Sequence, residues 1–303
     1  MEEKLRSLLL KQHYKIAGRH SAVKLCHWLK KSILGEGCCY KEDFYGISSH
    51  RCLQFTPAVE YCSHQCVYCW RNMEYTNPEP MTDFDGPEEI IDEAIGCQRL
   101  LLTGYGGIMD RVVERKYLEA HHPNQAAISL AGEPTYYPKL SELLGCFHDR
   151  GFTTFLVSNG TNPQALENLD VLPTQMYVSL DAPSRKDYLE ICNPLLEGLW
   201  ENILESQKVV SEMDCRTVNR LTLIKEVNMQ MLEGYAELIS MAEPDYVEVK
   251  GFMFVGGARQ RLRLRNMPSH SEILDFSEKL SEILGYKITK MREDSRVVLL
   301  EKN

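Results

Sequence analysis

The sequence lacks the features that would place it in a membrane or outside the cell. No apolar run approaches the ~18 residues that a membrane-spanning helix needs. The first four residues, Met-Glu-Glu-Lys, do not resemble the start of a signal peptide. Low-complexity segments are absent as well. With 44% hydrophobic and 25% charged residues, the chain is therefore expected to be a globular cytoplasmic protein.

The chain also has fewer basic than acidic residues. The 34 Lys and Arg residues are outnumbered by 43 Asp and Glu residues, and the net charge of −9 argues against general affinity for nucleic acid. The distribution is uneven, because residues 1–52 carry ten basic and five acidic residues, or +5, which leaves −14 for the rest of the chain. A basic N-terminal part and an acidic body predict that one face meets a polyanion.

Disulfide bonds are not expected, although the chain has eleven cysteines. The number is odd, and seven of the cysteines precede residue 70, whereas a secreted disulfide scaffold would be shorter and more evenly linked. Thiols clustered in a large intracellular chain are more typical of metal ligands.

Three of these thiols occur in the run Cys62-Ser63-His64-Gln65-Cys66-Val67-Tyr68-Cys69. Their spacing allows one compact loop to direct three sulfurs at one small metal centre. The run lacks a fourth ligand, unlike four-cysteine iron–sulfur sites and structural zinc sites, which are closed. Three ligands leave one metal position open for a reacting molecule. The alternative is a zinc loop completed by His64 or by a distant ligand.

The pattern Cys-x₃-Cys-x₂-Cys, with Tyr68 just before the third cysteine, resembles the signature of radical S-adenosylmethionine (SAM) enzymes. The resemblance implies that Cys62, Cys66 and Cys69 hold a [4Fe–4S] cluster and that Tyr68 lies at the cofactor site. In that family the open iron binds SAM, and reduction cleaves SAM to methionine and a 5′-deoxyadenosyl radical.

From residue 51 onward, apolar strands alternate with amphipathic helices, which predicts βαβ units and a parallel sheet. Strands are expected at 52–59, 126–131, 153–158, 176–180, 220–224 and 246–252. Helices are clearest at 88–101, 139–150, 199–213 and 232–241. Six repeats favour an incomplete (β/α)₆ barrel over residues 51–303, the α/β fold of radical SAM enzymes. Residues 1–50 are expected to form an N-terminal extension, with one or two helices over residues 4–34.

The ends of the predicted strands resemble SAM-binding elements of that family, and active sites of barrels lie at the carboxyl ends of the strands. Ala131-Gly132-Glu133-Pro134 is similar to the family's Gly-Gly-Glu-Pro element, with alanine in the first position. The resemblance implies that Gly132 and Glu133 hold the methionyl ammonium group of SAM. Alternatively, Glu133 caps the helix that follows it.

Two further strand ends resemble cofactor contacts. Ser158 and Asn159 end one strand as the family's ribose and carboxylate contacts do, although an Asn-Gly pair is more often a simple turn. Ser179 and Asp181 end the next strand, and both side chains can face the barrel mouth because side chains alternate along a strand.

The N-terminal part supplies another set of thiols. Cys26, Cys39 and Cys52 are spaced thirteen residues apart, too far for one loop, but a fold can gather them into a second [4Fe–4S] cluster with one open iron. Cys38 leaves the choice of ligand open. The remaining thiols are interpreted as unpaired buried cysteines, namely Cys97, Cys146, Cys192 and Cys215.

Four arginines alternate near the C-terminal end, in Gly256-Gly257-Ala258-Arg259-Gln260-Arg261-Leu262-Arg263-Leu264-Arg265. In an extended segment their guanidinium groups would lie on one side, with no acid nearby, and bidentate phosphate contacts favour arginine. We therefore expect Arg259, Arg261, Arg263 and Arg265 to bind RNA phosphates. A solvated charged edge is the alternative.

Three cysteines before a radical SAM barrel, followed by a basic segment, resemble the 4-demethylwyosine synthase family. Gln54-Phe55-Thr56-Pro57 and Cys69-Trp70-Arg71 agree as well. The resemblance implies that 1-methylguanosine beside the anticodon of phenylalanine tRNA loses a hydrogen from its methyl group and adds to pyruvate. The pyruvate anchor is either the open iron of the second cluster or a Schiff base with Lys41. No flavodoxin-like domain fits in 303 residues, so the short archaeal form is expected, as a monomer with an external flavodoxin- or ferredoxin-like electron donor.

Two other functions compete with this interpretation. A radical SAM activase that places a glycyl radical on a partner protein also carries extra cysteines, but usually at closer, ferredoxin-like spacings. A zinc-stabilised RNA-binding module would explain the thiols and the arginines without any catalysis.

Overall fold

The structure, a computed structural model, describes every residue from Met1 to Asn303. The chain is divided into two compact units. The first comprises residues 1–61, 79–157 and 169–174, and the second comprises residues 62–78, 158–168 and 175–303. No helix is both long enough and apolar enough to cross a lipid bilayer.

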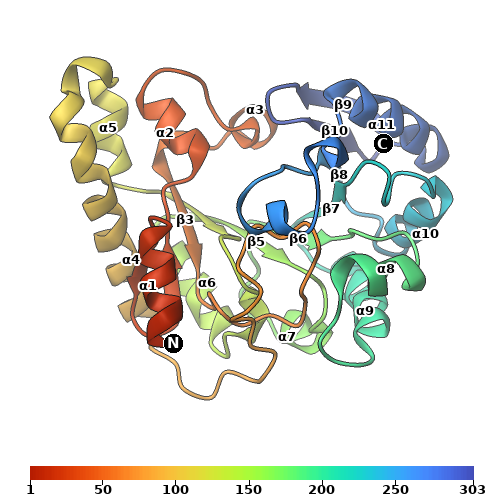
Figure 1. The fold of residues 1–303 in the computed structure, drawn as a ribbon, viewed down its shortest axis with the longest axis horizontal. Helices are drawn as coiled ribbons and strands as arrows, with labels where there is room; N and C mark the ends of the chain where they lie inside the picture. The colour runs from red at the N-terminus through yellow and green to blue at the C-terminus, as the bar shows by residue number, and fades with distance from the viewer. The chain divides into compact units, whose positions relative to one another are not determined.

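The first unit contains strands in the order β1-β2-β3-β4-β5, of which β3 and β5 are labelled in Figure 1. β1, β2 and β3 are antiparallel neighbours, whereas β3, β4 and β5 run parallel. The parallel strands are largely buried, as expected for a sheet that is covered on both faces. The strands span Lys15–Ala17, Ser21–Val23, Cys52–Thr56, Gln125–Ile128 and Thr153–Ser158, and Ser158 already belongs to the second unit.

The N-terminal extension is only partly helical. Helices α1 (Glu3–Lys11) and α2 (His27–Ile33) flank the hairpin that β1 and β2 form, so the expectation of helices over residues 4–34 is wrong for the middle of that range. Gly18 lies in the hairpin turn with φ +64°, a conformation that favours glycine. All three residues of β2 are buried, which leaves no polar face for an amphipathic helix.

The helices of the first unit pack against its strands. α4 begins at Pro87, whose missing N–H costs nothing at the first helical position, and it contacts β1, β2, β3 and α6. The helices and 3₁₀ turns span Tyr40–Tyr45 (α3), Ser49–Arg51 (η1), Pro87–Leu102 (α4), Thr103–Arg111 (η2), Glu114–Ala120 (α5), Pro134–Tyr136 (η3) and Leu140–Asp149 (α6).

The strands of the second unit are neighbours in the order β6-β7-β8-β10-β9. β6, β7 and β8 run parallel, and β10 and β9 extend the sheet in the antiparallel sense. β9 is mostly exposed and carries three basic residues, a composition that protects an edge strand from pairing with other chains. The strands span Gln175–Ser179, Arg216–Leu223, Tyr246–Gly251, Val297–Glu301 and Lys287–Arg292.

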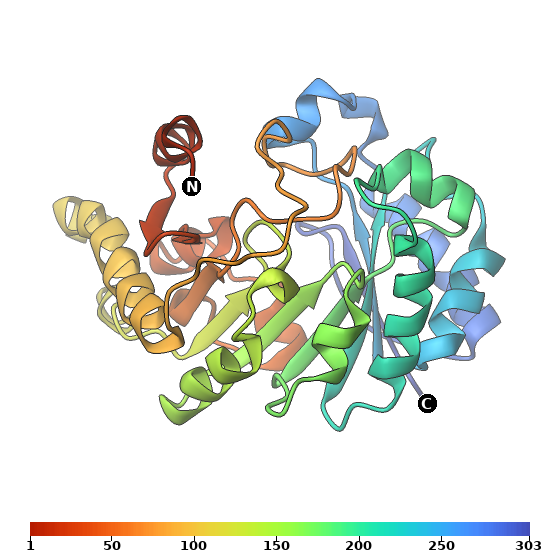
Figure 2. The ribbon, with the colours of Figure 1, turned by 90° about the horizontal axis from the view of Figure 1, so that it is seen from below.

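Helices α9, α10 and α11 stand side by side against the strands of the second unit (Figure 2). Their apolar faces meet a core that includes the fully buried side chains of Tyr235, Phe252 and Ile273. The helices and 3₁₀ turns span Pro163–Glu167 (α7), Arg185–Cys192 (α8), Leu199–Ser211 (α9), Leu232–Ala242 (α10), Gly256–Gln260 (η4), Leu264–Asn266 (η5) and His270–Leu284 (α11).

The six predicted parallel strands and the four predicted helices are all present, with ends that differ by a few residues. The antiparallel pair β9 and β10 was not predicted, and neither were α8 and α11. The predicted division into residues 1–50 and 51–303 stays a prediction, and its boundary lies inside the first compact unit.

Two helical glycines provide a test of the packing. An alanine at Gly234 in α10 would bring its Cβ within 2.4 Å of the Pro183 carbonyl oxygen, whereas one at Gly96 in α4 would meet nothing within 4 Å. Gly96→Ala should raise the free energy of unfolding by about 1 kcal/mol through helix propensity. Gly234→Ala should lower it by about 1–3 kcal/mol through overpacking. Urea unfolding of the cluster-free variants measures both, and equal shifts of the same sign would contradict the packing.

Candidate active site

The three-thiol run has no regular secondary structure, and its backbone is fixed by a neighbouring segment of the second unit. We call residues 62–69 the cysteine loop. The amide of Val67 donates to the carbonyl of Ile191 (2.8 Å), and the amide of Leu195 donates to the carbonyl of Ser63 (2.9 Å). The segment around the end of α8 therefore pairs with the loop and satisfies backbone groups that would otherwise be left without partners.

The three thiols of the loop act electrostatically on one cation, Arg71. Burial acts to lower the pKa of Arg71, but the neighbouring thiols of Cys62, Cys69 and Cys66 raise it above its ordinary value. Cys62 and Cys66 are buried, and Cys69 is half-buried. Three convergent thiols beside a cation fit a cluster held by three thiolates, because a buried negative centre needs a nearby positive charge.

Asn159 contacts the cysteine loop within the second unit. Its Nδ2 donates to Ser63 Oγ (3.3 Å) and lies 3.8 Å from the sulfur of Cys62. Its Oδ1 accepts from both the amide and the hydroxyl of Thr161, at 3.0 and 2.7 Å, and Ser158 is buried in the same turn. The simple turn expected for the Asn159-Gly160 pair is therefore present, and Asn159 also positions the cysteine loop.

The side chains of Tyr68 and Asp181 are hydrogen-bonded to each other. The Tyr68 hydroxyl donates to the Asp181 carboxylate, whose other oxygen accepts from the amide of Thr222 (3.0 Å). Burial raises the pKa of Tyr68 well above its ordinary value, and the neighbouring Asp181 adds to this. Both oxygens of Asp181 have protein partners, so the structure gives this residue a positioning role. Direct contact of Tyr68, Ser179 or Asp181 with SAM stays a prediction.

Residues 256–265 do not form the extended segment that was predicted. They form η4 and η5, and the segment is anchored on the residues after the cysteine loop. The amide of Gly257 donates to the carbonyl of Trp70 (2.8 Å), and a Cβ on Gly257 would come within 2.3 Å of the Arg71 carbonyl oxygen. Only glycine allows this approach, which sequence reasoning missed because it read the Gly-Gly pair as the start of a basic strand.

Arg261 is part of this anchor. Its guanidinium donates through Nε to the carbonyl of Val67 (3.1 Å) and through a second nitrogen to the carbonyl of Cys69. The side chain is half-buried and spans the end of the cysteine loop. The structure therefore places Arg261 on the loop, where its guanidinium is engaged by two carbonyls.

The other three arginines of the segment are exposed. Arg259 donates to the carbonyl of Phe254 (3.2 Å), and its guanidinium lies 5.7 Å from the centre of that ring. Arg265 pairs with Glu226 at 3.4 Å, so the expectation that no acid lies nearby is wrong. Arg263 lies between them at the start of η5. Whether these arginines bind phosphates stays a prediction.

Gly132 and Glu133 follow β4 in the first unit. Gly132 has φ +69°, and a Cβ there would lie 1.7 Å from the carbonyl oxygen of Ala58, so only glycine fits. Glu133 is buried, its amide donates to the carbonyl of Tyr61 (2.8 Å), and its carboxylate accepts the hydroxyl and amide of Thr135. The capping role of Glu133 is thus confirmed, and its contact with SAM stays a prediction.

The N-terminal thiols gather in the first unit. Cys26 and Cys39 are the N-cap residues of α2 and α3, and Cys52 begins β3. Burial raises the pKa of Cys52 well above its ordinary value, and the thiols of Cys26 and Cys39 raise it further. Lys41, in the first turn of α3, acts in the opposite sense on both Cys52 and Cys26. Three separate elements therefore bring three thiols and one cation together, a donor set that fits a second cluster.

Comparison with known proteins decides the family. A model described as the radical SAM superfamily matches residues 57–239, and one described as wyosine base formation matches residues 241–302. The S-adenosyl-L-methionine-dependent tRNA 4-demethylwyosine synthase of Pyrococcus abyssi is 50% identical over 305 residues, which cover 99% of this chain and 89% of the relative. The chain belongs to the radical SAM tRNA 4-demethylwyosine synthases.

Solved structures of this family agree over nearly the whole chain. One, described as TYW1 with a lysine-pyruvate adduct bound, has a TM-score of 0.90 at 40% identity and covers 99% of this chain and 96% of that one. Another, described as archaeal TYW1, has a TM-score of 0.82 at 38% identity with the same coverage. The expected radical SAM α/β fold and the expected enzyme class are confirmed. Membership of the family also implies SAM and one [4Fe–4S] cluster.

Cys192 has a contact that sequence reasoning missed. Cys97, Cys146, Cys192 and Cys215 all lack a disulfide, as predicted, but only Cys192 is buried. Burial raises the pKa of Cys146 and Cys215 to about 11. Cys192 also lies beside Cys66, with the two sulfurs within 4.8 Å, and their hydrogen bond lowers the pKa of Cys66 and raises that of Cys192. The sequence contains no signal for this contact, because the two residues lie far apart along the chain.

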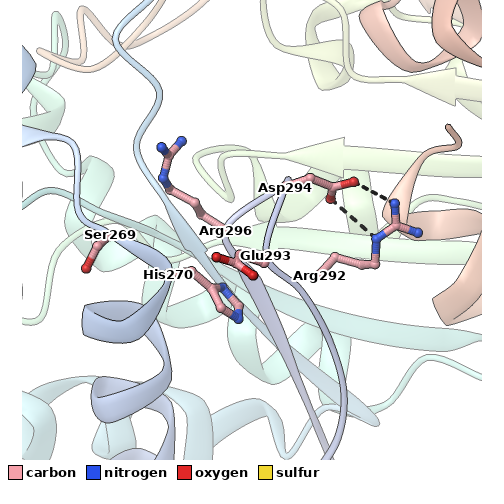
Figure 3. Close-up of a pocket in the computed structure, with 6 residues that line it drawn as sticks. All are labelled: Ser269, His270, Arg292, Glu293, Asp294 and Arg296. Atoms are coloured by element: carbon pink, nitrogen blue, oxygen red, sulfur yellow. Dashed lines mark hydrogen bonds and ion pairs between the residues drawn. The ribbon is translucent and has the colours of Figure 1, made fainter. Parts of the chain in front are cut away.

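A surface concavity of about 690 Å³ also lies in the second unit (Figure 3) and is lined by Ser269, His270, Arg292, Glu293, Asp294 and Arg296. Arg292 is paired with Asp294 at 2.7 Å. The guanidinium of Arg296 contacts the sulfurs of Met253 and Met267, at 3.5 and 3.8 Å. Both signs of charge line the concavity, so it does not select an anion, and we assign it no role in the reaction.

Replacing Arg261 with Gln should weaken the cysteine loop. A hydrogen bond from a charged donor contributes about 1.5–3 kcal/mol, and Arg261 makes two of them to the loop. After reconstitution with iron and sulfide, Arg261→Gln should lose iron to a chelator severalfold faster than the unchanged protein. Arg263→Gln, an exposed arginine two residues away, is the matched control and should behave as wild type. Equal rates for the two variants would show that Arg261 does not support the loop.

Proposed function

We propose that this chain joins two carbons of pyruvate to the 1-methylguanosine beside the anticodon of phenylalanine tRNA, with loss of the pyruvate carboxylate carbon, and so forms 4-demethylwyosine. Its family supports the product. The solved relative described as holding a lysine-pyruvate adduct supports pyruvate as the second substrate. The observation that carries the proposal in this chain is Lys41, a buried lysine beside three gathered thiols.

Lys41 is proposed as the anchor for pyruvate. Its amine would attack the pyruvate carbonyl, lose water and leave a Schiff base that holds the substrate in place. Lysines are rarely buried, yet this side chain is only 9% exposed and its Nζ lies 4.9 Å from the centre of the Phe155 ring. The short helix α3 fixes its backbone. These contacts support an amine that is oriented by the protein before the substrate arrives.

Cys26, Cys39 and Cys52 are proposed to hold a second [4Fe–4S] cluster in the same part of the first unit. The thiols of Cys26 and Cys39 both raise the pKa of Cys52, which supports this set. Cys38 is not among the main causes of that pKa shift. When bound, such a cluster would supply an open iron that acts as a Lewis acid toward a carboxylate. Lys41 and this iron remain alternative anchors for pyruvate, and the experiment below distinguishes them.

Radical generation is assigned to the cysteine loop, which would hold a [4Fe–4S] cluster and so would supply the electron that cleaves SAM. In this proposal Cys62, Cys66 and Cys69 are the ligands. The turn at Asn159 and the anchor at Arg261 keep the loop in shape. Residues proposed to contact SAM are Tyr68, Gly132, Glu133, Ser158, Asn159, Ser179 and Asp181.

The tRNA backbone is proposed to meet the exposed arginines of the second unit. Arg259 and Arg263 are the leading candidates. Arg265 pairs with Glu226 through two exposed side chains, and such pairs are weak enough for a phosphate to displace the acid. Arg261 is left out, because the cysteine loop occupies it. An external electron donor, a monomeric state and a cytoplasmic location stay predictions.

The decisive test of function is anaerobic incubation with SAM, a reductant, pyruvate and methylated tRNA, with mass spectrometry of the nucleosides. Lys41→Arg keeps the charge but cannot form a stable Schiff base, so it should form 5′-deoxyadenosine and no tricyclic base. Borohydride should trap pyruvate on Lys41 of the wild type and not on the variant. Lys24→Arg, a half-buried lysine 4.7 Å from the Tyr14 ring centre, is the control and should stay active. Wild-type product formation by Lys41→Arg would transfer the anchor role to the iron.

The second cluster is tested by removing its three thiols together. The variant with Cys26, Cys39 and Cys52 replaced by Ala should fall from about eight to about four irons per chain. It should still form 5′-deoxyadenosine, because radical generation is assigned to the other cluster, but it should make no tricyclic base. Cys38→Ala should keep about eight irons. Full iron content in the triple variant would remove the second cluster from the proposal.

The role of the arginines is tested by the salt dependence of tRNA binding. Replacing Arg259 and Arg263 with Gln should reduce the slope of log affinity against log salt by about two units, one for each lost phosphate contact. Lys279→Gln, which removes an exposed cation paired with Asp275 on α11, should leave the slope unchanged. If the double variant keeps the wild-type slope, these arginines form only a solvated edge.

A further inference from the structure

His64, Cys66 and Cys192 form a compact cluster of metal-binding side chains in the second unit. One nitrogen of His64 and the two sulfurs all lie within 4.8 Å of one another. The three residues are 3%, 9% and 4% exposed, so all three donor groups are withdrawn from solvent. Only Cys66 belongs to the set of thiols assigned to the radical SAM cluster.

The backbone holds the three residues in this arrangement. The amide of Gln65, between His64 and Cys66, donates to the carbonyls of Cys192 and Asn193, both at 3.1 Å. His64 forms an isolated bridge with Pro194 just beyond. Because these bonds lie next to all three donor residues, Cys192 keeps its place beside Cys66 without help from a bound cluster.

The imidazole of His64 is held at both nitrogens. Its Nε2 lies 2.7 Å from the Tyr188 hydroxyl, and its Nδ1 lies 3.4 Å from Asn159 Nδ2. The ring also packs edge-on against Tyr188, with 5.3 Å between the ring centres. A metal ion would replace the contact at one nitrogen, and the hydrogen bond at the other would fix the orientation of the ring, as is regular for histidines that bind metal ions.

A small cavity adjoins these side chains. His64, Asn159, Tyr188 and Cys192 are among the residues that line it, and its volume is about 10 Å³. This is about the room that one water molecule needs, and too little for any organic ligand. The cavity has room for the one water molecule that would complete the coordination of an ion held by the neighbouring nitrogen and sulfur donors.

We propose that, in protein without its radical SAM cluster, His64, Cys66 and Cys192 bind one zinc ion. Zinc prefers tetrahedral sites built from thiolate sulfur and imidazole nitrogen, at about 2.3 and 2.0–2.1 Å, and water takes the fourth position. Two thiolates neutralise the charge of the ion, which suits a buried site. Because Cys66 serves both centres, zinc and the iron–sulfur cluster exclude each other. This inference rests on the geometry and is independent of the proposed reaction.

Cobalt(II), which reports thiolate ligands through its charge-transfer absorption, is the probe of choice, added to reduced, cluster-free full-length protein without oxygen. Cys62→Ala provides the sharpest background, because it cannot complete the three-thiol set of the cysteine loop yet retains all three proposed ligands. This variant should still bind cobalt at the site, and zinc should displace it. Adding Cys192→Ser should weaken zinc binding by about 100-fold or more. Any cobalt bound by the N-terminal thiols is common to both variants and cancels in the comparison.

Controls separate the site from its alternatives. Cys215→Ser, which removes another thiol of the second unit, should not change cobalt binding. Cys192→Ser with an intact cysteine loop should still take up iron and sulfide, which shows that it folds, and zinc should no longer slow that uptake as it does in wild type. Loss of cobalt binding in Cys62→Ala alone would overturn the proposal, because the ion would then belong to the three-thiol run. So would a Cys66–Cys192 disulfide, seen by mass spectrometry, that persists in the reduced protein and excludes cobalt.

Discussion

The structure depends on hydrogen bonds that hold a loop with no secondary structure of its own. Eight residues of irregular backbone carry the three thiols, and a buried irregular backbone must find its partners elsewhere. The segment at the end of α8, the turn at Asn159 and the side chain of Arg261 supply them. Each comes from a different part of the second unit, so the sulfurs are positioned by tertiary contacts rather than by local helix or strand geometry.

The two sets of thiols are arranged according to one electrostatic principle. Burial alone would keep thiols protonated, because it disfavours the thiolate that binds metal. In the second unit, Cys62, Cys69 and Cys66 raise the pKa of Arg71. In the first unit, Lys41 acts to lower the pKa of both Cys26 and Cys52. A cation beside each set stabilises the charged form, and in the proposed reaction Lys41 would lose its proton and attack pyruvate as the neutral amine. Charge balance and chemistry are thereby combined in Lys41.

The basic segment near the C-terminal end, residues 256–265, does not have the extended conformation that its alternating arginines predicted. Alternating arginines have the period of a strand, and that period predicted four guanidinium groups on one side. The two glycines before them allow close approach to the backbone after the cysteine loop, and this approach bends the segment into 3₁₀ turns. Arg261 consequently faces the loop, while Arg259 and Arg263 stay exposed. One residue of the four has a structural role that no pattern in the sequence indicated.

The sequence by itself determined the parts of this protein that depend on local order along the chain. The spacing of Cys62, Cys66 and Cys69, the six buried parallel strands and the glycine after β4 all follow from short-range patterns, because hydrophobic period and residue spacing are local properties. Tertiary structure alone decided which distant groups meet. It paired Cys192 with Cys66, set Lys41 among the N-terminal thiols and turned Arg261 onto the loop. These contacts join residues far apart along the chain, and no local pattern records which of them folding will bring together.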